Sequence, residues 1–153
     1  MGKHFSTFRH DVWLPYKFAV GQVFKAFYDG LKEEKILGNQ CQSCGKIFVP
    51  PRSFCPDCNV DMGDYTEVSQ EGEIVTWTLA KEAFFGSPLD PPFITALIRL
   101  DGVSCDLLHL VGGFDLSDVT GVRQRIKKNR RVRAVWNDEK QGHLLDIKYF
   151  EPL

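Results

Sequence analysis

The sequence predicts a mostly β protein that begins with an α-helix, continues into a small cysteine ribbon and ends in a five-stranded barrel of the oligonucleotide/oligosaccharide-binding (OB) type. Three observations predict this order. An amphipathic segment comes first, two C-x-x-C pairs follow it, and five strand-like segments fill the rest of the chain. We expect residues 1–38 to form an arm and the helix, 39–63 the ribbon, and 64–153 the barrel.

The composition is that of a globular protein with balanced charge. Of the 153 residues, 43% are hydrophobic, and 19 Lys and Arg stand against 20 Asp and Glu. This charge balance argues against a general binder of nucleic acid or of an anionic membrane. No apolar run approaches the roughly 18 residues of a membrane span, and the first ten residues lack an apolar signal core, so we expect a cytoplasmic protein.

The first 17 residues mix aromatic and charged side chains without a helical or strand period, which indicates an extended arm. Trp13 and Tyr16 are its candidate anchors on a partner protein, because exposed aromatic side chains are enriched at interfaces. The alternative is that the arm packs on its own domain.

Apolar residues recur at helical spacing between Val20 and Lys35, which predicts one amphipathic helix that Gly38 terminates. Its apolar stripe contains Phe24, Phe27 and Leu31. The stripe is wide for a helix that covers only a small ribbon. It is therefore either core against the next module or an interface with another subunit.

Four of the five cysteines form two C-x-x-C pairs, Cys41 with Cys44 and Cys55 with Cys58. Each short turn presents two thiolates, and two such turns hold one metal ion tetrahedrally. Gly45 and Asn59, the residues after the second cysteine of each pair, tolerate the left-handed backbone that such a knuckle needs. We interpret the segment as a rubredoxin-like zinc ribbon, and its closed four-thiolate site would make the Zn²⁺ structural.

Other uses of these cysteines fit less well. Iron uses similar spacing, although a closed all-thiolate site outside redox proteins more often holds zinc. Disulfides are disfavoured by the odd fifth cysteine and by the absence of a secretory leader. A thioredoxin-like motif should open a helix, whereas Asn59, Asp61 and Gly63 follow the second pair.

Five segments after Gly63 have strand character: Gly72–Glu82, Phe93–Leu100, Val103–Val111, Arg131–Trp136 and Leu144–Phe150. Gly72 suits a bulge or tight bend, and Asp101-Gly102 predicts a hairpin turn. A long first strand and a longer connection between the third and fourth strands indicate the Greek-key OB barrel. Cys105 is expected to be a buried, small apolar side chain within the third strand.

Several motifs together resemble the DUF35 family, whose members are zinc-ribbon plus OB-fold proteins found alongside thiolases and related acyl-CoA enzymes. In chain order they are Tyr16-Lys17-Phe18-Ala19-Val20-Gly21 at the helix entry, Gly38 before the first knuckle, Pro50-Pro51-Arg52 ahead of Phe54-Cys55-Pro56-Asp57-Cys58, and the strand from Gly72 to Trp77. The resemblance covers residues 16–151. Its most specific part is Pro50-Pro51-Arg52 followed by the second cysteine pair.

The resemblance implies a non-catalytic accessory subunit. Members of the family form complexes with a thiolase-like enzyme. In archaea they bridge acetoacetyl-CoA thiolase and hydroxymethylglutaryl-CoA synthase so that the CoA intermediate passes between them, and in bacteria they partner enzymes of steroid side-chain breakdown. We therefore expect this chain to be a scaffold that binds such enzymes and helps hold or channel an acyl-CoA. Its basic segment 121–133 is longer than the strand entry typical of the family.

Seven Lys or Arg residues occupy the eleven positions from 123 to 133. They are either a solvated edge that prevents strand pairing, or a site for the phosphates of CoA or for a nucleic-acid backbone. The candidate CoA ligands are Arg123, Arg125, Lys127, Lys128 and Arg130. A single-stranded nucleic-acid site, with bases stacked on Phe84, Phe85 and Trp136, is the alternative function.

The sequence shows no motif of an independent catalyst. Its four histidines are scattered, and it has no glycine-framed nucleophile and no metal-binding histidine pair. We expect His109 to be a packed or edge residue. The Gly- and Pro-rich segment 84–92 either closes on a ligand or is a stiff connection.

Overall fold

A computed structural model describes residues 17, 19–83, 87, 89–118 and 120–153. Trp13, Tyr16, Phe84 and Phe85 lie outside these residues, so their predicted roles stay predictions. The elements in chain order are α1 (Gln22–Lys32), β1 (Leu37–Gln40), β2 (Ile47–Phe48), β3 (Tyr65–Glu67), β4 (Glu71–Ala80), β5 (Phe93–Leu100), β6 (Leu107–Val111), α2 (Val122–Lys128), β7 (Arg131–Trp136), the 3₁₀ helix η1 (Leu144–Asp146) and β8 (Ile147–Pro152).

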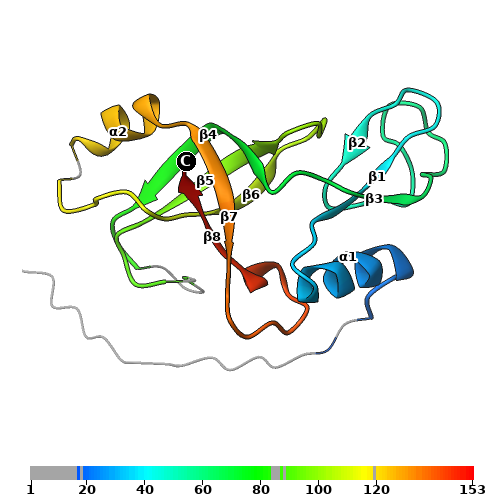
Figure 1. The fold of residues 1–153 in the computed structure, drawn as a ribbon, viewed down its shortest axis with the longest axis horizontal. Helices are drawn as coiled ribbons and strands as arrows, with labels where there is room; N and C mark the ends of the chain where they lie inside the picture. The colour runs from blue at the N-terminus through cyan, green and yellow to red at the C-terminus, as the bar shows by residue number, and fades with distance from the viewer. Residues whose placement is uncertain (1–16, 18, 84–86, 88, 119) are drawn as a thin grey trace, which may run out of the picture.

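The strands form two sheets (Figure 1). The ribbon contains three strands in the order β2-β1-β3, and the remaining five close into a barrel in the order β4-β5-β6-β8-β7. Within the barrel only β6 and β8 pair in parallel, at Val111 and Phe150. The predicted fold class, a helix followed by a ribbon and a five-stranded OB-type sheet, is confirmed.

Helix α1 is shorter than predicted and ends at Lys32. Glu34 adopts a positive φ of 57°, and the N–H of Lys35 donates to the carbonyl of Gly30 at 2.9 Å, which closes the last turn. The prediction that Gly38 stops the helix is wrong. Gly38 lies inside β1, where an added Cβ would stand 2.8 Å from the Phe48 carbonyl oxygen, so it permits the close approach of β2.

The apolar stripe of α1 packs into the chain's own core. Phe27 and Leu31 are 1% and 0% exposed and belong to the same hydrophobic cluster as Ile74 and Phe150 of the barrel. Both are therefore core residues of this chain, and the prediction that they meet a partner is wrong. Phe24, by contrast, is 45% exposed.

A buried carboxylate holds the loop that supports α1. Asp146 accepts hydrogen bonds from the backbone N–H groups of Gln141, Gly142 and His143 at 3.0, 2.7 and 3.1 Å. Desolvation raises the pKa of Asp146, but these three hydrogen bonds outweigh it, and the pKa is lowered. The loop touches α1 closely, because a Cβ on Gly142 would stand 2.5 Å from Cε of Lys32.

Two predicted strands begin later than expected. The third starts at Leu107 and not at Val103, because residues 103–106 form a turn in which the N–H of Ser104 donates to the ribbon residue Ile47 at 2.8 Å. Cys105 lies in this turn and is half-buried, so its predicted place within a strand is wrong. The fifth starts at Ile147, after a 3₁₀ turn.

The bulge in the first barrel strand lies between Ile74 and Thr76 and not at Gly72. Gly72 instead faces the backbone of β5, where an added Cβ would stand 2.4 Å from the Arg99 carbonyl oxygen. Two adjacent strands therefore approach closely at Gly72, and the sheet bends two residues later.

Helix α2 was not predicted, because its charged side chains mask a short apolar pattern. Val122 and Ile126, four residues apart, are 0% and 2% exposed and anchor it to the core. The helix lies at the end of the barrel remote from the ribbon (Figure 1). Among the described residues, neither α1 nor α2 has the length and apolar character needed to cross a membrane.

Candidate metal centre and basic pocket

The two cysteine knuckles have the same backbone geometry. In the first, the N–H of Gly45 donates to the carbonyl of Cys41 at 2.8 Å, and in the second the N–H of Asn59 donates to that of Cys55 at 2.9 Å. Gly45 and Asn59 have positive φ angles of 73° and 53°. The residue types at these positions therefore match the left-handed turns that aim two sulfurs at one point.

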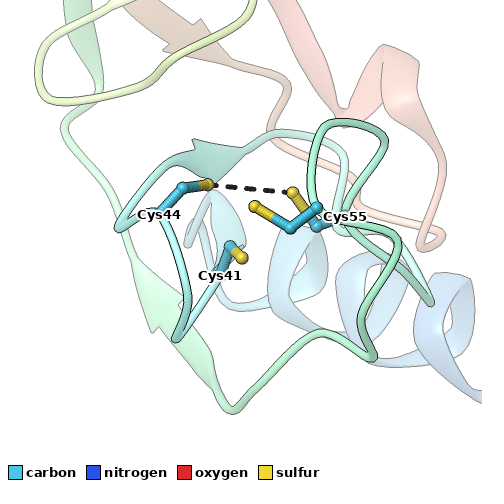
Figure 2. A group of neighbouring side chains, drawn as sticks. Cys41, Cys44 and Cys55 are labelled. Atoms are coloured by element: carbon cyan, nitrogen blue, oxygen red, sulfur yellow. Dashed lines mark hydrogen bonds between the residues drawn. The ribbon is translucent and has the colours of Figure 1, made fainter.

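The four sulfurs fit a tetrahedral metal ion. The Sγ atoms of Cys41, Cys44, Cys55 and Cys58 all lie within 4.8 Å of one another, and those of Cys44 and Cys55 are 3.8 Å apart. A tetrahedron with Zn–S bonds of about 2.3 Å has edges of about 3.8 Å. Figure 2 shows the labelled sulfurs converging on the space between the knuckles. All four ligands come from the protein, which leaves no coordination position for a substrate.

The electrostatics of the cluster are consistent with a bound cation. The backbone N–H of Cys44 lowers the pKa of Cys41 to about 7. The N–H of Lys46 acts in the same direction on Cys44, but desolvation and the neighbouring sulfurs prevail and raise its pKa to about 12. Like charges this close cannot all form unaided, so a metal ion is needed to hold four thiolates together.

The turn that leads into the second knuckle is hydrogen-bonded to β1. The side chain of Asn39, which is 2% exposed, donates to the carbonyl of Arg52 at 2.7 Å and accepts from its N–H at 3.0 Å. Lys46 and Asp57 form an ion pair between the two knuckles. These contacts hold the sulfurs in place from outside the metal site.

The basic run from Arg123 to Arg133 divides into two groups. Arg125 faces its own loop, where it donates to the carbonyls of Asp115 and Asp118 at 2.8 and 2.9 Å. Arg131 makes two hydrogen bonds to Asp101, at 2.6 and 2.7 Å. These arginines are satisfied within the chain, so Arg125, a predicted CoA ligand, is occupied in a structural role.

The second group lines a cavity of about 270 Å³ between β4 and α2. Its walls are Ile74, Val75, Thr76, Trp77, Arg123, Ile126, Lys127 and Arg130. Three of the five predicted ligands are thus brought together, whereas Lys128 and Arg125 do not line the cavity. Trp77 was not predicted as a site residue, since nothing in the sequence shows that β4 and α2 line one cavity.

The remaining predicted chemical residues are packed. His109 is 4% exposed, its Nε2 lies 3.1 Å from the carbonyl oxygen of Leu144, and its ring meets Phe150 edge to face. Burial lowers the pKa of His109. Trp136 donates through Nε1 to the side chain of Gln70 at 2.8 Å and is half-buried, and it does not line the basic cavity.

A four-thiolate knuckle pair joined to a closed five-stranded sheet defines the class of zinc-ribbon/OB-fold proteins. Family models match in that order: the rubredoxin-like zinc ribbon domain of ChsH2 over residues 29–61, and the C-terminal OB-fold domain of ChsH2 over residues 65–137. The chain belongs to the DUF35 family. A solved DUF35 protein of unknown function from Sulfolobus solfataricus is 36% identical, with a TM-score of 0.53, over 61% of this chain and 70% of that one.

Other relatives are more distant. Two proteins named DUF35 domain-containing scaffold protein, from Pyrococcus furiosus and Methanocaldococcus jannaschii, are 27% and 26% identical over 67 and 68 residues, or 44% and 43% of this chain. The matches span about half, 48%, of each relative's length. The structure titled Ltp2-ChsH2(DUF35) aldolase has the same fold, with a TM-score of 0.62 at 17% identity, over 89% of this chain and 98% of that one.

Proposed function

We propose that this protein is a non-catalytic scaffold subunit that binds a thiolase-type acyl-CoA enzyme and helps hold or channel an acyl-CoA intermediate. The observation that carries the proposal is the match to two proteins named scaffold proteins. The closed metal site supports it, because four protein thiolates leave the metal no room to act on a substrate. In this proposal the metal is Zn²⁺ and structural, and catalysis belongs to the partner.

The partner is proposed to be a thiolase-like enzyme, with hydroxymethylglutaryl-CoA synthase as a second partner. A structural neighbour supports an enzyme partner, because it is the Ltp2-ChsH2(DUF35) aldolase. The CoA phosphates are assigned to the basic run, where Arg123, Lys127 and Arg130 line one cavity.

The partner surface is proposed to include the exposed aromatic pair Phe24 and Phe54, which are 45% and 57% exposed. Together with residues 50–53 they line a largely apolar cavity of about 390 Å³ between α1 and the ribbon. An exposed apolar hollow beside aromatic side chains and an arginine is typical of a protein interface. Phe24 is thus the residue of the predicted helix stripe that remains available to a partner.

Purification without a tag from the native source, followed by size exclusion and mass spectrometry, tests the scaffold role. We expect a thiolase-class enzyme to co-elute. The double variant Phe24→Ala with Phe54→Ala should lose that enzyme and keep its zinc, whereas Lys25→Ala, a neighbour on the exposed side of α1, should keep both. Elution of the wild-type chain alone near its mass of 17.4 kDa, at low salt and with zinc bound, would refute the proposal.

A further inference from the structure

We infer that the cavity between β4 and α2 binds the nucleotide end of its ligand, a nucleoside diphosphate group, with Arg123 and Lys127 as phosphate ligands, Arg130 as a positioning residue and Trp77 as the contact for the base. The inference deepens the proposed function and rests on it for the identity of the whole ligand, CoA. The site itself rests on the geometry of the cavity.

The cations of the cavity are arranged for an anion. Arg123 and Lys127 are four residues apart on α2 and therefore lie on the same side of the helix, with the buried Ile126 beside them. Within the described part of the chain neither forms an ion pair, so both are available to an incoming phosphate. Every ionisable side chain that lines the cavity is basic.

Arg130 is held in place before any ligand arrives. Its guanidinium donates to the carbonyl of Ile74 at 2.9 and 2.6 Å and to that of Val75 at 3.2 Å, and Nε lies 3.1 Å from the carboxylate of Glu73. The bulge at Ile74 and Thr76 presents these two successive carbonyls to one arginine. A side chain that is already ordered loses little entropy on binding.

The net charge fits a diphosphate. Arg123, Lys127 and Arg130 contribute three positive charges, and Glu73 beside Arg130 removes one, which leaves two. Arg and Lys bind phosphate oxygens through charge-assisted hydrogen bonds. The cavity therefore suits a dianionic group better than a carboxylate.

The aromatic side chain in the cavity and the volume of the cavity both favour a nucleotide as the ligand. Trp77 lines the cavity together with the cations and is half-buried, and it also lines a second hollow over β4 and β5. An aromatic side chain beside phosphate ligands provides a stacking surface for a base. About 270 Å³ lies below the usual range for whole drug-sized ligands, so the cavity accommodates only part of a molecule as large as CoA.

Isothermal titration of the zinc-bound chain with ADP, adenosine 3′,5′-bisphosphate, CoA and pyrophosphate tests the inference. We expect the three adenine ligands to bind. The double variant Arg123→Ala with Lys127→Ala should weaken each about tenfold or more. Lys128→Ala, which removes one positive charge from the same helix outside the cavity, should bind as the wild type does. Trp77→Leu should weaken the adenine ligands and leave pyrophosphate unchanged.

Some outcomes would overturn the site. The first is that no adenine ligand binds. The second is that Lys128→Ala loses as much ligand affinity as the double variant does. The third is tight binding of oligo-dT that ADP does not displace. The last outcome, with a steep salt dependence, would indicate a nucleic-acid site instead. Nucleotide binding without a co-eluting enzyme would refute the scaffold role alone, and a co-eluting enzyme without nucleotide binding would refute this site alone.

Discussion

The thiol of Cys105 lies between the two backbone polar groups of Val49: its Sγ is 3.3 Å from the Val49 nitrogen and 3.2 Å from the Val49 oxygen. The sulfur accepts from the N–H and donates to the carbonyl. Cys105 belongs to the turn that joins β5 to β6, whereas Val49 follows β2 of the ribbon. Cys105 packs against both hydrophobic clusters of the molecule and so connects the ribbon to the barrel.

Removing this thiol should therefore loosen the connection. We expect Cys105→Ala to lower the free energy of unfolding by about 1–2 kcal/mol, because the N–H and carbonyl of Val49, which is 2% exposed, lose their partner. Cys105→Ser retains a donor and an acceptor and should lose less. Urea denaturation with zinc present measures both, and equal stability of the alanine variant and the wild type would contradict the expectation.

The zinc assignment predicts a difference between the five cysteines. Purified protein should contain one zinc per chain, and Cys55→Ala should contain less, because a three-thiolate site binds the ion more weakly. Cys105→Ser should retain one zinc and is the matched control. Elemental analysis decides the metal. Iron in the wild type, or full zinc occupancy in Cys55→Ala, would contradict the assignment.

The close approach at Gly72 predicts a large effect from one methyl group. Gly72→Ala should destabilise the protein by about 2 kcal/mol or more, because the new Cβ would stand 2.4 Å from a backbone oxygen of β5 that cannot move aside by itself. Thr78→Val changes an exposed residue of the same strand and should stay within about 0.5 kcal/mol of the wild type. Thermal denaturation compares the two, and equal melting temperatures would show that β5 yields at Gly72.

Buried His109 predicts a loss of stability in mild acid. Its pKa in the folded state lies below the ordinary value of 6.5, because burial disfavours the charged ring. The unfolded chain therefore binds a proton that the folded chain does not, and stability falls as the pH drops below about 6.5, by at most about 1.4 kcal/mol per pH unit.

Denaturation at pH 7.5 and 5.5 measures this dependence. His109→Gln, which is neutral at both pH values, should lose less stability between them than the wild type does. If His109→Gln loses as much stability between pH 7.5 and 5.5 as the wild type does, the acid sensitivity comes from other groups.

Much of the fold was predicted from patterns within short stretches of the sequence. The spacing of the cysteines identified the ribbon, because a knuckle is built within a few consecutive residues, and Gly45 and Asn59 indeed adopt positive φ. Strands β5 and β7 begin and end at the bounds predicted from the strand character of their segments. The five-stranded OB-type barrel was predicted from the number of strands and from one long connection, and the structure gives the strand order β4-β5-β6-β8-β7.

The errors lie where distant segments meet. In the sequence Gly38 predicts the end of a helix, but in the fold it permits the close approach of β2 to β1. Val103 was predicted to begin a strand, but the N–H of the next residue, Ser104, donates to Ile47 of the ribbon. The core position of Phe27 and Leu31 could not be separated from an interface position, because an apolar stripe has the same spacing in both.

The sequence by itself determined the composition of each module: four cysteines in two C-x-x-C pairs, a helix with one apolar face, and five strands. The tertiary structure alone decided which side chains share a site. It turned Arg125 toward its own loop and placed Arg123, Lys127 and Arg130 around one cavity with Trp77. The physical reason is distance along the chain. Turns and strands depend on neighbouring residues, whereas the cavity is lined by residues of β4 and of α2, which lie some 50 residues apart in the sequence.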